Sequence, residues 1–75
     1  MIRQAKRQYK NHEVHSDNLG VDIIFEAEYE NGNEGFEGWA INIRDVLRKG
    51  VSVYDQDWNM IALTEEVQEY IDKNY

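Results

Sequence analysis

Carboxylates alternate with other residues through the stretch 22–30, a spacing that places them on one face of a β-strand. Side chains two positions apart on a strand lie about 6.6–6.8 Å apart, and two nucleotide rises along one DNA strand cover about the same distance. Carboxylates at this pitch could imitate phosphates and bind a basic protein surface, although solvent-facing strands also commonly carry such charges. The carboxylates are Asp22, Glu26, Glu28 and Glu30.

Aromatic side chains are the second group with binding capacity, because Tyr, Trp and Phe are enriched in protein interfaces. Phe36 lies in the glycine-rich stretch 31–38, and Trp58 lies in an Asp/Asn-rich stretch that predicts a turn. We interpret both as candidate anchors for a partner; the alternative is packing under a helix. If 31–38 were ordered over a pocket, binding of a small ligand would be favoured instead.

Potential metal ligands are few and poorly spaced. The stretch 55–66 places acidic or amide side chains at positions 1, 3, 5 and 12 of a calcium-loop numbering, but Met60 occupies position 6, where that loop requires glycine. His12 and His15 would point to opposite faces of a strand, and the chain has no cysteine to complete a zinc site. We interpret both histidines as surface residues and predict no metal and no cofactor.

A catalytic set is also missing from the sequence. There is no cysteine nucleophile, and neither Ser16 nor Ser52 has a nucleophile-elbow setting. The glycines of 31–38 do not match a phosphate-binding pattern. A chain of 75 residues leaves little room for a deep cleft, so we predict a non-enzymatic protein.

The charge is strongly acidic and uneven. Fifteen acidic residues against eight basic ones give a net charge of −7, which argues against direct binding to nucleic acid or anionic membranes. Between Glu13 and Glu37 there are eight acids and no Lys or Arg. No apolar run approaches the ~20 residues that span a bilayer, and the N-terminus lacks the apolar segment of a signal peptide. We therefore expect a soluble, cytoplasmic protein.

Two segments show the period of half-buried strands. In Val21–Glu30 every odd position is apolar or aromatic, and every even position except Ile24 is acidic. Trp39–Ile43 repeats the alternation, so the two segments predict a hairpin. Lys6–His15 is weaker and is predicted to pair on the other side of Val21–Glu30. The basic segment 1–12 would be frayed or an edge strand, and 44–50 fits either a helical turn or a continued strand.

The C-terminal part combines strand and helix patterns. Val51–Tyr54 is rich in β-branched and aromatic residues, and 60–63 is predicted to pair with it as a second hairpin. Thr64 is a suitable N-cap for a final helix, whose apolar stripe begins at Val67. The predicted fold is α+β: an antiparallel β-meander of four to five strands with one C-terminal helix packed on one face.

We predict one domain, residues 1–75, whose core is thin enough that a homodimer is expected. The chain's size, its acidity and its strand–turn–strand–helix end (51–75) resemble short accessory proteins of bacteriophages and prophages. That resemblance implies an inhibitor that binds and blocks a host protein. The predicted function is a protein-binding module that occupies a basic, nucleic-acid-binding surface, as a DNA mimic does. The alternative is a homo-oligomer that binds or sequesters a small ligand.

Overall fold

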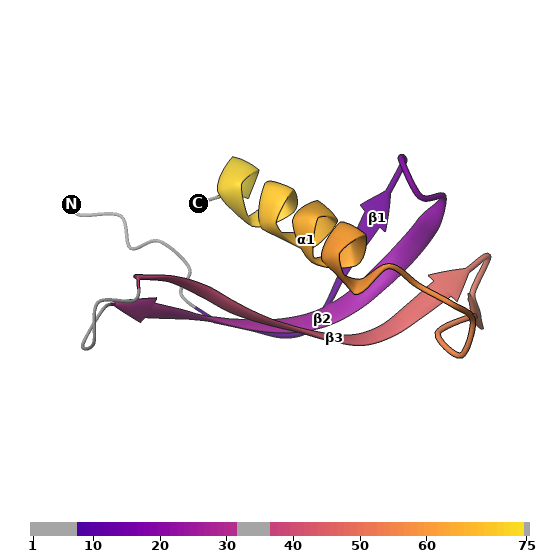
Figure 1. Ribbon diagram of the computed structural model, residues 1–75, viewed down its shortest axis with the longest axis horizontal. Helices are drawn as coiled ribbons and strands as arrows, with labels where there is room; N and C mark the ends of the chain where they lie inside the picture. Colours follow the sequence, from indigo (N-terminus) through magenta and orange to yellow (C-terminus); the bar gives the residue numbers. More distant parts are fainter. Residues whose placement is uncertain (1–7, 32–36, 75) are drawn as a thin grey trace.

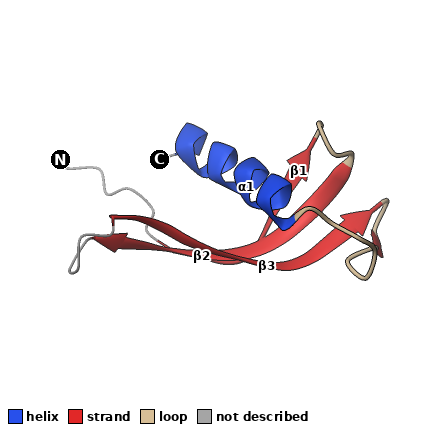
Figure 2. Cartoon of the chain, viewed as in Figure 1, coloured by secondary structure: helices blue, strands red, loops and turns tan. Residues whose placement is uncertain are grey.

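The computed structural model describes residues 8–31 and 37–74 of the chain. In chain order the elements are β1 (Gln8–Ser16), β2 (Val21–Asn31), β3 (Glu37–Arg48), β4 (Val51–Ser52) and α1 (Met60–Asn74). The strands form one antiparallel sheet in the order β1-β2-β3-β4, and α1 lies across one face of it (Figure 1, Figure 2). The predicted α+β fold, with a meander sheet and a C-terminal helix, is confirmed.

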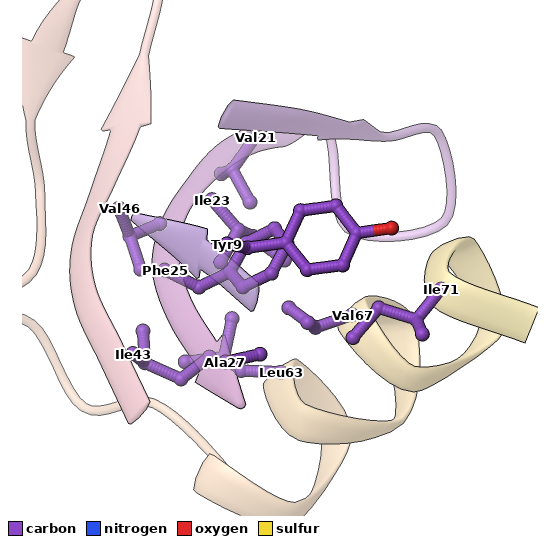
Figure 3. Close-up of a cluster of buried hydrophobic side chains, with 10 residues drawn as sticks. All are labelled: Tyr9, Val21, Ile23, Phe25, Ala27, Ile43, Val46, Leu63, Val67 and Ile71. Carbon is purple, nitrogen blue, oxygen red and sulfur yellow. The ribbon is translucent and has the colours of Figure 1, made fainter. Parts of the chain in front are cut away.

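β2 supplies most of the sheet's contribution to the core. Its odd-numbered side chains from Val21 to Ala27 are buried, whereas its even-numbered side chains are half-buried or exposed, as the alternation predicts. The buried side chains lie between the sheet and α1 (Figure 3). They are Tyr9, Val21, Ile23, Phe25, Ala27, Ile43, Val46, Leu63, Val67 and Ile71.

Two bulges keep apolar side chains on the core face. In β1 the register shifts between Tyr9 and His12, where Asn11 adopts a left-handed φ of 46°. In β3 the register shifts once more, and Arg44 is the extra residue opposite the continuous run of β2. After this insertion Val46 returns to the core, so one additional residue in each strand that flanks β2 preserves the buried face.

The ambiguous stretch 44–50 is a continued strand followed by a turn. β3 runs to Arg48, which pairs with Val51 of β4. The two residues between them, Lys49 and Gly50, both have positive φ, 51° and 80°. Positive φ at both central positions is typical of the type I′ turn that joins two tightly paired strands.

The predicted strand over 60–63 is wrong, because α1 already begins at Met60. Its N-cap is Asn59 rather than Thr64: the Asn59 Oδ1 accepts hydrogen bonds from the backbone amides of the second and third helical residues, at 3.0 and 3.2 Å. A four-residue apolar run fits a strand or a buried helix segment equally well, and here the cap decides. The additional turn brings Leu63 into the buried stripe.

Candidate functional site

Three glutamates of β2 form a row on the sheet face that α1 does not cover. We call Glu26, Glu28 and Glu30 the acid row. They alternate with the core residues of β2; Glu28 and Glu30 are exposed and Glu26 is half-buried. The structure thus places these three predicted site residues together on one outward face.

The acid row faces short, uncharged neighbours on β3. Gly38 pairs with Glu30, Ala40 with Glu28 and Asn42 with Glu26. Among residues 8–31 and 37–74, no Lys or Arg forms an ion pair with these carboxylates. The row is therefore accessible to a cationic group from another molecule.

A shallow hollow of about 250 Å³ lies beside the acid row, across β1, β2 and β3. Its lining includes five residues with polar side chains: Gln8, Lys10, Glu26, Glu28 and Asn42. Four of these five side chains offer oxygen acceptors. Such a lining suits the guanidinium or ammonium group of an incoming side chain, since charge-assisted hydrogen bonds to carboxylates are the stronger kind.

Asp22 lies on the same face but apart from the acid row, because Ile24 stands between them. Its Oδ1 is 2.7 Å from Nδ1 of His15, the residue paired with it on β1, and Asp17 lies 3.2 Å from Nε2 of the same ring. The hydrogen bond to Asp22, helped by attraction to both carboxylates, raises the pKa of His15 above its ordinary value, although desolvation acts in the opposite direction. The charge of Asp22 is thus directed to a histidine of its own chain.

Replacing Asp22 by asparagine is expected to lower the pKa of His15 toward its ordinary value. Because the folded state raises this pKa, the interaction stabilises the fold below the unfolded-state pKa, and that stabilisation is lost as pH rises through the folded-state value. NMR titration of the imidazole protons measures the shift. Asp17→Asn should lower the pKa less, since its contact is longer; equal titration curves in Asp22→Asn and the parent chain would contradict the pairing.

Of the two aromatic candidates, Phe36 and Trp58, the structure describes only Trp58. Phe36 lies outside the described residues, as does most of 31–38. The structure therefore does not test whether this stretch favours binding of a protein or of a small ligand. Trp58 is half-buried and packs against the core, and its Nε1 donates a hydrogen bond of 2.7 Å to the carbonyl of Val53. Trp58 therefore also helps to hold the connection between β4 and α1.

Two contacts between α1 and the sheet were not predicted from the sequence. His12 Nε2 lies 2.8 Å from the Tyr70 hydroxyl, so His12 is half-buried beneath α1 and its interpretation as a surface residue is wrong. The Ser16 hydroxyl donates to Glu66, which also accepts from Asn18 at 3.0 Å. The hydrogen bond from Ser16, and to a lesser extent that from Asn18, lowers the pKa of Glu66. These hydrogen bonds therefore stabilise the fold above the unfolded-state pKa of Glu66, and the stabilisation is lost as pH falls through the folded-state pKa.

Metal-ligating clusters and membrane-spanning helices are absent from the described residues. Within 8–31 and 37–74, no three His, Cys, Asp or Glu side chains are grouped closely enough to hold a metal ion. In the same part of the chain no helix has both the length and the apolar character needed to cross a bilayer. Comparisons with protein-family models, curated proteins and solved structures found no match to this chain.

Proposed function

We propose that this protein is a small non-enzymatic binding module that uses the acid row to occupy a basic surface of another protein. The observation that carries the proposal is the acid row itself: three carboxylates on the sheet face that α1 does not cover, beside short and uncharged residues of β3. Strand geometry spaces them about 6.6–6.8 Å apart, close to the axial rise over two nucleotides of one DNA strand. A protein surface built to bind nucleic acid is the partner whose charges this row fits best.

Long-range charge supports the same function. A net charge of −7 on 75 residues attracts a basic partner before contact, and the hollow beside the acid row offers acceptors to an Arg or Lys side chain on arrival. Because the module would cover residues that otherwise contact phosphates, it would compete with nucleic acid and act as an inhibitor. In such an encounter the acid row mainly sets the association rate.

Replacing Glu26, Glu28 and Glu30 together by glutamine tests the proposal, because it removes three charges and keeps the side-chain shape. A pull-down from host lysate with the parent chain, read by mass spectrometry, supplies the partner. At low salt the triple variant is then expected to associate with that partner about tenfold or more slowly, since steering of this kind changes association rates by ~10–10³. Raising the salt concentration to 1 M shortens the Debye length to ~3 Å and should slow the association of the parent chain. Most of the difference in association rate between the parent chain and the triple variant should then disappear.

A matched control removes the same net charge elsewhere. Asp55, Asp57 and Glu65 are exposed and lie outside the sheet, so Asp55→Asn, Asp57→Asn and Glu65→Gln together leave the acid row intact. This control should associate nearly as fast as the parent chain. If the acid-row variant associates as fast as the control, the row is only a solvated face and the proposal is wrong.

A further inference from the structure

One apolar residue of β2 points away from the core. The even-numbered side chains of β2 lie on the sheet face that α1 does not cover, and Ile24 is the apolar one among them. Leu47 of β3 shares this face, because it pairs with Asp22. Both apolar side chains are half-buried, and neither belongs to the core cluster or to the half-buried residues that pack on it. Ile24 and Leu47 are diagonal neighbours on adjacent strands, a spacing of about 7–8 Å.

Carboxylates surround Ile24 on all four sides. Across the sheet it pairs with Glu13 of β1 and with Asp45 of β3. Along β2 its neighbours on the same face are Asp22 and Glu26. We call these four residues the carboxylate ring. An apolar centre inside a polar rim is the arrangement that protein interfaces have.

The neighbouring cations leave the carboxylate ring mostly unpaired. Lys10 of β1 and Arg44 of β3 form no ion pair within the part of the chain that the structure describes. His15 contacts Asp22 alone among the four ring carboxylates. Two copies of this face would oppose carboxylates to carboxylates, which is costly, so a second copy of the chain does not fit. Charge complementarity therefore selects a basic partner.

We propose that Ile24 and Leu47 are the apolar anchor of the acid row's binding surface and receive an apolar side chain from a basic protein segment. This inference rests on the proposed function, since the acid row continues into the carboxylate ring through Glu26. It adds a requirement: the partner segment carries an apolar residue among its Lys or Arg residues. Imitation of phosphates alone needs no such contact. The acid row sets mainly the association rate, whereas the anchor slows dissociation.

Two short lysine peptides test the anchor. They differ only at their centre, which is leucine in one and serine in the other, so their charges are equal. The parent chain should bind the leucine peptide about fivefold or more tightly, because burial of apolar surface is favourable. Ile24→Thr keeps a β-branched residue in the strand. This variant should lose most of the preference and bind the serine peptide as the parent chain does. Fluorescence anisotropy of the labelled peptides at low salt measures each dissociation constant.

Ile61→Thr is the matched control, because Ile61 is exposed on α1 and lies away from the acid row. It should keep the preference for the leucine peptide. Equal binding of the two peptides by the parent chain overturns the inference. A preference that survives in Ile24→Thr, or that disappears in Ile61→Thr, also overturns it.

The variant with glutamine at all three acid-row positions separates this inference from the proposed function. It should bind both peptides more weakly than the parent chain does, because it loses three charges that attract lysine. If it binds the serine peptide as tightly as the parent chain, the proposed function itself is contradicted. If it weakens both peptides but the parent chain shows no preference for leucine, only the apolar anchor is wrong.

Discussion

Replacing Phe25 by alanine is expected to cost about 3–5 kcal/mol of unfolding free energy, the usual range for a buried aromatic residue. Phe25 is fully buried at the centre of the sheet. The centroid of its ring lies 5.5 Å from that of Tyr9, 5.6 Å from that of His12 and 6.4 Å from that of Tyr70. The whole free energy of unfolding of a 75-residue chain is only about 4–11 kcal/mol. The substitution should therefore leave a marginally folded protein, measured by urea unfolding at 25 °C.

Phe25→Leu is the matched comparison, because leucine keeps most of the buried volume and removes the aromatic contacts. It should lose clearly less stability than Phe25→Ala, with an unchanged dependence on urea concentration. A midpoint for Phe25→Ala close to that of the parent chain would mean that Phe25 does not anchor the core.

Two aliphatic residues of α1 give the second large contrast. Leu63 is fully buried against the sheet, whereas Ile61 is 71% exposed. Leu63→Ala should cost about 2–5 kcal/mol, since it removes buried methyl groups and leaves a cavity. Ile61→Ala should stay within about 0.5 kcal/mol, the usual range for a surface substitution. Both changes are read from the same urea or thermal unfolding curves.

This pair also tests where α1 begins. If residues 60–63 were a strand, as their composition alone allowed, neighbouring side chains would alternate across a sheet, and Leu63 and Ile61 would share one face. Equal costs for the two substitutions would therefore contradict the helix start at Met60. Asn59→Ala, which removes the cap, should in turn cost about 0.5–2 kcal/mol.

The predictable part of the fold is the part encoded by local period. The two-residue alternation of 21–30 determines which face of β2 is buried, because each odd side chain must leave water together with its neighbours. The start of α1 was not predictable in the same way, since four apolar residues carry no period of their own. It depends on the hydrogen bonds of Asn59, whose neighbours Asp57 and Trp58 also fit a hairpin turn.

In the candidate site, too, sequence spacing predicts one part of the arrangement and not the other. That Glu26, Glu28 and Glu30 share a face follows from sequence spacing alone. The contact of Asp22 with His15 does not, because it depends on the register between β1 and β2, which brings His15 opposite Asp22. No local pattern indicates such a pairing, and the bulge at Asn11 adds a shift that sequence spacing does not contain.

The connectivity of the sheet also governs how quickly the chain can fold. Each strand pairs with its neighbour in sequence, and β3 and β4 are joined by only Lys49 and Gly50, so the hairpins close short loops at little entropic cost. Docking of α1 is different, because Ser16 and Glu66 are 50 positions apart and meet only when distant parts of the chain come together. Low contact order within the sheet favours rapid hairpin formation, and the docking of α1 onto Phe25 is the long loop closure that we expect to limit the folding rate.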